Sequence, residues 1–200
     1  MKTSEAGTKV GEIGREVKLW LAKDDGVEAS RPSHCAACGA AAYRGDGRLR
    51  LHGHGRRQRT VWGPQQPDGA PSEWDAWVRR YRCTGCRSVR TAARPGLGRR
   101  LRYSLCAIAL ALTAWAVWLL PATEVRARVS PFRTVGSNEA ERWRSLRRWA
   151  RRAAGLFGLP AAATVATPKE QAARAARLVR ARGPTDRAEA ERVFIGARVG

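Results

Sequence analysis

The stretch RRYRCTGCRSV at residues 79–89 places two cysteines two residues apart in a strongly basic part of the chain. The segment before the cysteines, WDAWVRRYR at 74–82, has the composition of a strand, so the pair stands at the turn that follows it. A second CxxC pair precedes this one by 44 residues. Because a CxxC turn directs two thiolates at one point, two such turns supply a tetrahedron of sulfurs. The doubled motif predicts a structural zinc site with the ligands Cys35, Cys38, Cys83 and Cys86.

Two other interpretations of the thiols stay open. A thioredoxin-like redox pair needs a single CxxC within a βαβ pattern, which this sequence lacks, and the thiols of a degenerate copy would hold no metal. A four-cysteine site is closed to water and substrate, so its metal would stabilise the fold and would not catalyse. Cys106 is expected to be a small buried apolar residue. The histidines are expected to be exposed, to support a ligand or to contact phosphate: His34, His52 and His54.

The charge of the chain points to a polyanionic partner. The sequence of 200 residues carries 38 Lys and Arg against 17 Asp and Glu, a formal charge of +21. Most of this excess lies in the middle, where residues 31–100 contain 15 Arg and 4 acidic residues. Nucleic acid is the first candidate for such a surface. The N-terminus lacks the uninterrupted apolar core of a secretory signal, so the expected location is the cytoplasm, where thiols stay free or bind metal.

The first half of the chain is expected to be extended and the second half helical. Period-two patterning predicts a short strand at 16–22, and short extended pieces are expected over 35–62, before a loop at 63–73 and a linker at 94–100. Five helices are predicted after that linker. They cover Arg102–Leu119, Ala122–Val129, Asn138–Gly155 with Asn138 as N-cap, a segment from the capping box Thr167–Glu170 to Gly183, and a segment beginning at the signal Asp186–Glu189.

Residues 103–120 form an uncharged run of 18 residues, which meets the lower limit for a membrane span. Its alanine content and the arginines that flank both ends favour a buried core helix instead. Apolar side chains follow i, i+3, i+7 spacing along this run, as a packed helix requires. They are Leu105, Ile108, Leu112, Trp115 and Leu119.

The segment NEAERWRSLRRWARRAA at 138–154 has two different faces when it is drawn as a helix. One stripe is apolar and holds Trp143, Leu146, Ala150 and Ala153. The opposite stripe is cationic and holds Arg144, Arg147, Arg148 and Arg151. Solvated faces usually mix charges of both signs, so the second stripe is expected to contact phosphate. The same role is expected for arginines of the extended half, namely Arg56, Arg57, Arg59, Arg79 and Arg80.

Taken in order, several segments resemble a known family. The CxxCG motif is followed by RLRLHGHGRRQRTVW, VRRYRCTGCRSV, RRLRYSL and RWRSLRRWARRA. Over about 31–155, this order of segments resembles that of bacterial transposase-associated zinc-binding proteins with a helix-turn-helix segment. Related domains of unknown function are included in this resemblance. The resemblance implies a zinc-beta-ribbon that helps bind element ends, followed by a helical DNA-binding unit. The connection SPFRTVGS is longer than a standard helix-turn-helix turn. Too few residues follow 155 for the catalytic domain of such a transposase.

The sequence therefore predicts an α+β protein with a small four-cysteine zinc ribbon, a helix-turn-helix-like unit and a helical tail. The expected segments are a leader at 1–30, the ribbon at 31–100, the DNA-binding-like helices at 101–158 and a partly flexible tail at 159–200. The predicted function is non-catalytic DNA binding by a zinc protein of mobile-element origin. The alternatives are a single-span membrane protein with a cytosolic zinc head, a DNA-binding subunit whose transposase partner is encoded separately, and an RNA-binding ribbon.

Overall fold

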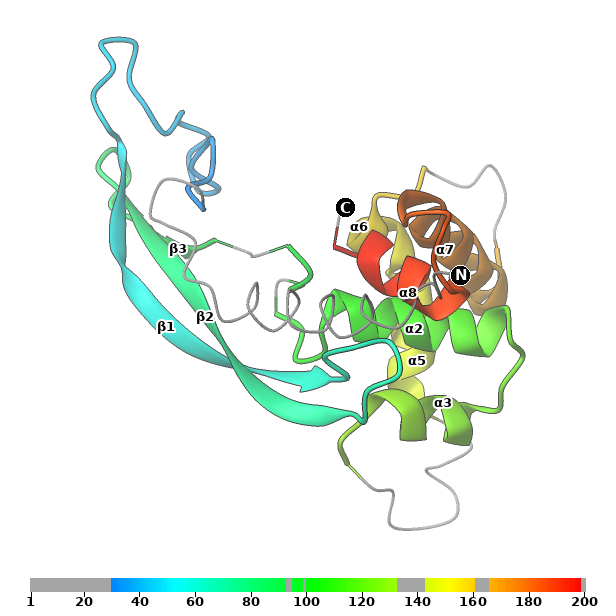
Figure 1. Cartoon of the computed structure of the whole chain (residues 1–200). Helices are drawn as coiled ribbons and strands as arrows, with labels where there is room; N and C mark the ends of the chain where they lie inside the picture. The colour runs from blue at the N-terminus through cyan, green and yellow to red at the C-terminus, as the bar shows by residue number, and fades with distance from the viewer. Residues whose placement is uncertain (1–29, 93–94, 99, 133–142, 161–165, 199–200) are drawn as a thin grey trace, which may run out of the picture. The chain divides into compact units, whose positions relative to one another are not determined.

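The structure, a computed structural model, describes residues 30–92, 95–98, 100–132, 143–160 and 166–198 (Figure 1). The described chain is mixed α+β, as the sequence predicts, with a three-stranded sheet followed by helices. The predicted strand at 16–22 and the predicted N-cap Asn138 lie outside the described residues. Contacts divide the chain into two compact units, each of which is discontinuous in sequence. Unit 1 comprises Met1–Thr60 and Asp75–Arg94, and unit 2 comprises Val61–Trp74 and Pro95–Gly200.

The sheet has the order β1-β2-β3, with β1 at Leu51–Gly63, β2 at Ser72–Cys83 and β3 at Val89–Thr91. The hydroxyl of Thr60 donates to Asp75 and the indole of Trp62 donates to Glu73, so β1 and β2 run in opposite directions. The short extended pieces expected over 35–62 are present before β1 as the isolated bridges His34–Ala41 and Tyr43–Leu49, whereas from Leu51 onward the chain forms one strand of 13 residues. The long partner strand β2 allows this length, because it offers backbone and side-chain bonds along β1.

The loop end of the hairpin belongs to unit 2. Trp62 donates its backbone N–H to Arg102 and accepts one from Ser104, and its ring meets Tyr103 edge to face at 5.4 Å. Gly63 has a φ of +124°, and a Cβ there would lie 2.5 Å from that of Ala107. Only glycine therefore lets this end of β1 approach the first turn of the helix that contains Ala107.

All the described helices belong to unit 2. They are α2 at Leu105–Ala116, α3 at Ala122–Val129, α5 at Arg144–Arg151, α6 at Ala153–Phe157, α7 at Pro168–Arg182 and α8 at Glu189–Gly196. The sequence places α3 correctly and predicts the helical character of the other five. The described part of the expected tail, 166–198, shares a core with α2, because Ala172, Ala175 and Val179 are buried in the same cluster.

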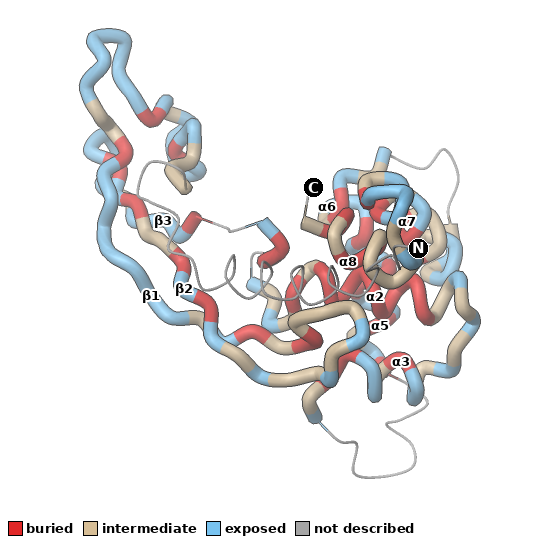
Figure 2. The backbone as a smooth tube through the Cα atoms, viewed as in Figure 1, coloured by how far each residue is buried: buried red, intermediate tan, exposed pale blue. Residues whose placement is uncertain are grey.

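Helix α2 is the central element of that core. Every residue from Cys106 to Ala114 is buried, and α3, α5, α7 and α8 all pack against it (Figure 2). Ser104 caps the helix by accepting the backbone N–H of Ala107. Its 12 residues fall short of the about 20 that a bilayer crossing requires, and no described helix is both long and apolar enough to span a membrane.

The predicted ends of two helices are wrong. Leu119 does not extend the apolar stripe of α2, because the helix has already ended and Leu119 is 67% exposed with a φ of +59°. The helix expected to end at Gly155 is interrupted at Arg152 and continues as α6 to Phe157, where Gly158 supplies a left-handed C-cap. A left-handed cap can form at Gly158, so Gly155 need not end the helix.

The capping box of α7 is confirmed. Thr167 accepts the backbone N–H of Glu170, and Glu170 accepts that of Thr167 at 2.7 Å. The corresponding prediction for α8 is wrong, because Ala188 is its N-cap and provides no side-chain bond. Asp186 instead lies 3.7 Å from the guanidinium of Arg187, so a sequence signal alone did not locate this helix start.

Candidate metal centre and nucleic-acid interface

The first thiol pair lies in a tight turn of unit 1. Cys35 donates its N–H to Ala40 and accepts one from Gly39 through its carbonyl, while the strand-like bridge His34–Ala41 closes the turn. Gly39 has a φ of +70°, a conformation that costs a residue with a side chain far more than it costs glycine. The sequence CAACG therefore folds both sulfurs toward one point.

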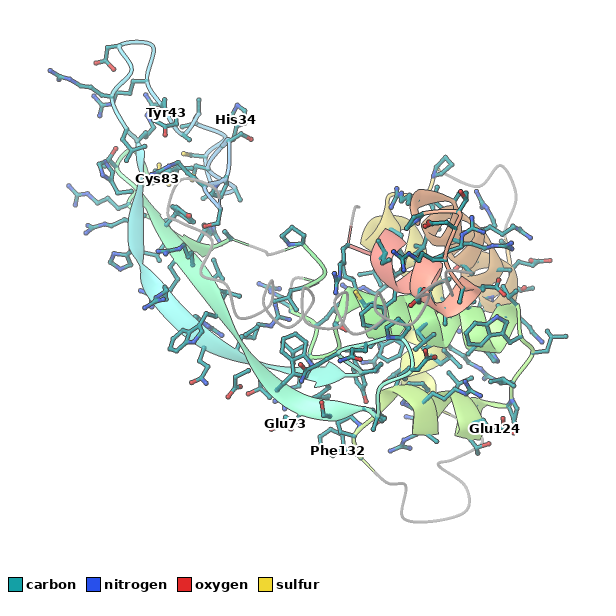
Figure 3. The ribbon with its side chains drawn as sticks, viewed as in Figure 1. His34, Tyr43, Glu73, Cys83, Glu124 and Phe132 are labelled. Carbon is teal, nitrogen blue, oxygen red and sulfur yellow. The ribbon has the colours of Figure 1, made fainter. Side chains whose placement is uncertain are left out.

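The second pair follows β2 in a similar turn. Cys83 is the last residue of the strand, and its backbone N–H bonds to Ser88 just before β3 begins. The sulfur atoms of Cys35 and Cys86 are 3.7 Å apart, and those of Cys38 and Cys83 are 3.9 Å apart. Cys83 lies in the same region of unit 1 as His34 of the first turn (Figure 3). Two turns distant in sequence thus meet through their thiols.

This arrangement fits a single metal ion. All four sulfur atoms lie within 4.8 Å of one another. In a tetrahedral site with metal–sulfur bonds of about 2.3 Å, sulfurs are separated by about 3.8 Å, which agrees with both measured pairs. A disulfide would need about 2.05 Å. The four thiols predicted from the sequence are therefore close enough to hold a metal, and thiolates favour soft or borderline ions.

Hydrogen bonds to the sulfurs favour thiolates at two of the four positions. Backbone N–H groups of Ala37 and Cys38 lower the pKa of the Cys35 thiol from 9.0 to about 6. Ser88, through its hydroxyl and its backbone N–H, lowers the pKa of Cys86. The backbone N–H of Ala40 lowers the pKa of Cys38, but bonds to the sulfurs of Cys86 and Cys35, together with desolvation and Cys83, outweigh it and raise this pKa to about 11. A metal ion would take the place of these shared protons.

The other candidate metal ligands stay apart from this cluster. Among the described residues, the four cysteines are the group close enough to hold an ion, and none of the three histidines joins them. A ring nitrogen of His34 bonds to Ser33, and one of His52 bonds to the carbonyl oxygen of Leu49. Cys106 is buried in α2, and burial raises the pKa of its thiol. The expectation of a small buried residue at 106 is confirmed.

The predicted arginines of the hairpin divide between two faces of the sheet. Side chains alternate along a strand, and the Thr60–Asp75 bond shows which β1 and β2 positions share a face. Arg56 and Arg79 lie on that face, whereas the other face carries Arg57, Arg59 and Arg80. Arg56 covers the ring of Trp77 at 5.4 Å. Desolvation by burial, with the nearby charge of Arg57, lowers the pKa of Arg59.

Helix α5 presents the predicted cationic stripe to solvent. Its exposed residues include all four expected arginines, namely Arg144, Arg147, Arg148 and Arg151. Within the described chain, none of these guanidinium groups forms an ion pair with a carboxylate. Leu146 and Ala150 are buried on the opposite side, as predicted. Trp149, which the predicted stripe omitted, is also buried, and its ring packs on Tyr103 at 4.8 Å.

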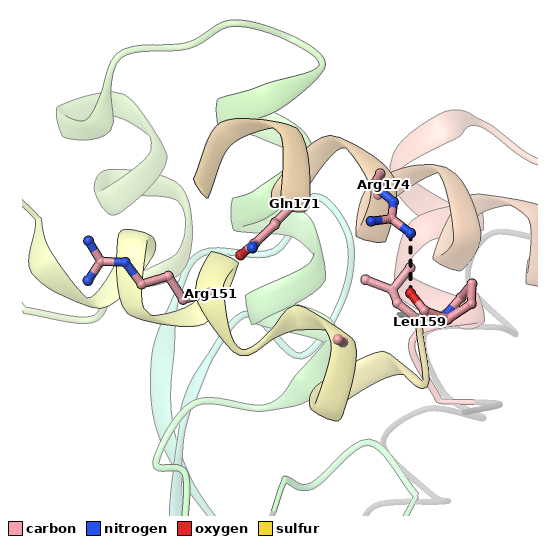
Figure 4. Close-up of a pocket in the computed structure, with 6 residues that line it drawn as sticks. Arg151, Leu159, Gln171 and Arg174 are labelled. Atoms are coloured by element: carbon pink, nitrogen blue, oxygen red, sulfur yellow. Dashed lines mark hydrogen bonds between the residues drawn. The ribbon is translucent and has the colours of Figure 1, made fainter. Parts of the chain in front are cut away.

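A small cavity of about 90 Å³ borders this stripe. It is lined by Arg151, Ala154, Leu159, Pro160, Gln171 and Arg174. Arg174 donates to the carbonyl of Pro160 at 3.2 Å, and Arg151 directs its guanidinium away from Arg174 (Figure 4). Three of the six lining residues are apolar, and the six include neither a carboxylate nor a thiol. The cavity therefore lacks the paired groups of a catalytic centre.

Comparison with known proteins gives no direct indication of function. No protein-family model matches the sequence, and no curated protein or solved structure matches it. The thiol cluster and the guanidinium groups of α5 therefore carry the functional inference. Thiol groups can bind a metal, and guanidinium groups recognise phosphate.

Proposed function

We propose that this chain is a non-catalytic DNA-binding protein whose unit 1 is a zinc ribbon of the kind found in transposase-associated proteins. Zinc is the ion of choice because it takes four thiolates in a tetrahedron. Cys35, Cys38, Cys83 and Cys86 fill all four positions, so no position remains for water or substrate. The metal then serves to hold the two CxxC turns together.

The observation that carries DNA binding is the exposed stripe of four arginines on α5. The apolar side of α5 is packed into the core by Leu146, Trp149 and Ala150, so the helix holds its arginines on a rigid base. Guanidinium groups spaced along one helix face match the repeated phosphates of a nucleic-acid backbone. In this proposal α5 takes the place of the second helix of a helix-turn-helix, with α3 as the preceding helix.

Binding through phosphates has a distinct signature. Each neutralised phosphate releases counterions, so the affinity falls with rising salt in proportion to the number of contacts. Binding of a mixed-sequence DNA duplex is measured over a range of salt concentrations for the wild type and for Arg147→Ala/Arg148→Ala. The double variant is expected to bind more weakly and to flatten the logarithmic salt slope by about two units.

The control variant removes equal charge elsewhere. Lys169 and Arg177 are exposed on α7, so Lys169→Ala/Arg177→Ala lowers the net charge by the same amount without touching α5. This variant is expected to keep the wild-type slope. An equal loss in both double variants would mean that net charge alone attracts DNA, and an unchanged slope in the α5 variant would remove α5 from the interface.

A further inference from the structure

Unit 1 exposes two large aromatic rings beside arginine side chains. Trp77, in the middle of β2, is 46% exposed, and Tyr43, in the turn region before β1, is 49% exposed. The guanidinium of Arg56 lies over the Trp77 ring at 5.4 Å, and that of Arg31 lies over the Tyr43 ring at 5.8 Å. An indole that is half exposed on a strand leaves much apolar area in water, which makes it a candidate contact for a partner.

These groups form one row along a face of β2. Trp77, Arg79 and Tyr81 point to the same side because they are two residues apart. Arg31 also lies over the ring of Tyr81 at 5.6 Å, so it stands between Tyr81 and Tyr43. We call this set the aromatic–arginine row. Its members are Arg56, Trp77, Arg79, Tyr81, Arg31 and Tyr43, all of them in unit 1.

The row is anchored at the end nearer the cysteines. Tyr81 is buried, and its hydroxyl bonds to that of Ser30 at 2.7 Å. Arg31 donates to the backbone carbonyl of Leu51 at the start of β1. Trp77 and Tyr43 are therefore exposed rings on a fixed base, which lowers the entropy that a ligand would have to overcome when it stacks on them.

We propose that the aromatic–arginine row binds unpaired bases of single-stranded DNA. This inference rests on the proposed DNA-binding function and assigns a second surface to it. Aromatic rings and arginine planes stack on bases of any sequence, while guanidinium charge attracts the backbone. In a duplex the base faces are stacked on one another, so a row of exposed rings offers little to duplex DNA. The positive charge of the arginines and the exposed rings together match the phosphates and the unpaired bases of single-stranded DNA.

The spacing of the row supports an unstacked strand. Same-face residues on β2 are about 6.7 Å apart, whereas bases in a stacked strand rise by about 3.4 Å. Successive bases must therefore separate before one can stack on Trp77 and the next can meet Arg79. Toward the hairpin loop the same face carries Asp75, which accepts bonds from Gln58 at 2.8 Å and Thr60 at 3.1 Å. This carboxylate repels phosphate and marks where the row ends.

The test compares a single strand with a duplex. Binding of a fluorescently labelled oligo(dT) and of a mixed-sequence duplex of the same length is followed by anisotropy, using the full chain loaded with zinc. Trp77→Ala is expected to weaken oligo(dT) binding by about 5- to 150-fold, the loss that corresponds to one stacked base. Duplex binding is expected to stay unchanged. Trp77→Phe keeps a ring and is expected to retain most of the affinity for oligo(dT).

A matched control uses an exposed ring outside the row. Phe132 is 45% exposed in unit 2, where it packs on Trp62 at 4.7 Å. Phe132→Ala is expected to leave oligo(dT) binding unchanged. Zinc content is measured in every variant, so that a loss of affinity with full zinc content reports the surface and not the fold.

The outcomes separate this inference from the proposed function. If Arg147→Ala/Arg148→Ala weakens duplex binding while Trp77→Ala leaves oligo(dT) binding intact, the proposed role of the aromatic–arginine row is overturned and the proposed α5 interface is supported. If Trp77→Ala weakens oligo(dT) binding and the α5 variant has no effect, the row stands and the α5 interface fails. Tighter binding of oligo(U) than of oligo(dT), with the same dependence on Trp77, would overturn the assignment to DNA.

Discussion

Different interactions stabilise unit 1 and unit 2 internally. In unit 1 the buried cluster around the thiols consists of Cys35, Ala42, Leu51 and Cys83, so half of its members are the cysteines themselves. In unit 2, by contrast, α2 is buried along most of its length and shares one continuous core with α3, α5, α7 and α8. Apolar burial is therefore ample in unit 2 and scarce around the thiols of unit 1.

This difference predicts different responses to the loss of a metal. Small domains that cannot bury enough apolar surface commonly depend on a bound metal, whose binding energy then becomes folding energy. Around the CxxC turns of unit 1, backbone hydrogen bonds and four thiols replace the side-chain packing that stabilises unit 2. Removing the metal should thus divide the molecule into a part that unfolds and a part that does not.

Zinc removal is expected to have the largest effect. Cys83→Ser, or a strong chelator, should release one metal ion per chain and unfold residues 31–60 and 75–92 of unit 1, because structural zinc contributes about 10–16 kcal/mol in small zinc domains. Unit 2 should keep its helical circular dichroism. Metal analysis and amide hydrogen exchange of β1–β3 measure the two effects. Cys106→Ala is the control and should keep the metal. Zinc retained in Cys83→Ser, or lost equally from the Cys106 variant, would contradict the site.

A truncation in the core of unit 2 tests the other half of the comparison. Leu112 is fully buried in α2, so Leu112→Ala should lower the free energy of unfolding by about 2–5 kcal/mol through lost contacts and a cavity. Zinc content should not change. Leu119→Ala removes the same atoms from a side chain that is 67% exposed and should cost less than about 0.5 kcal/mol. Thermal unfolding followed by circular dichroism distinguishes the two variants.

The sequence was most informative where the signal is local. Each CxxC turn directs its two thiols toward one point, and the structure brings all four predicted thiols within 4.8 Å of one another. The capping box at Thr167 and the amphipathic α5 were likewise predicted from neighbouring residues and are confirmed. The capping box and α5 depend on residues within one helix, and each CxxC pair depends on residues within one turn. That the two turns meet was predicted from the repetition of the motif.

The sequence was less informative where distant segments decide the structure. The single long strand β1 depends on its partner β2, and the division of the hairpin arginines between two faces depends on their register. Leu119 fits the apolar spacing of α2 but lies beyond the last helical turn. Trp149 could have been found, because it lies three residues after Leu146 and completes an i, i+3, i+4 pattern with Ala150. The aromatic–arginine row had no sequence signal, since it joins residues 31, 43, 56 and 77.

The smallest predicted effect concerns a helix end of unit 2 and its dependence on pH. The backbone N–H of Thr167, followed by its hydroxyl, lowers the pKa of the Glu170 carboxyl from its ordinary value of 4.5. The folded state therefore favours the carboxylate. The resulting stabilisation is complete above the unfolded pKa and is lost as the pH falls through the lower folded value.

The stability difference between the wild type and Glu170→Ala should accordingly be present at neutral pH and shrink as the solution is acidified below about pH 4.5. Amide hydrogen exchange at Thr167 reports this cap directly, because its N–H is the donor to Glu170. Glu191→Ala serves as the control, since Glu191 lies in the first turn of α8, whose N-cap Ala188 provides no side-chain bond. That variant should leave exchange at Thr167 unchanged at every pH. A stability difference for Glu170→Ala that stays constant on acidification would mean that the side chain acts through helix propensity and not through the carboxylate, because propensity does not titrate.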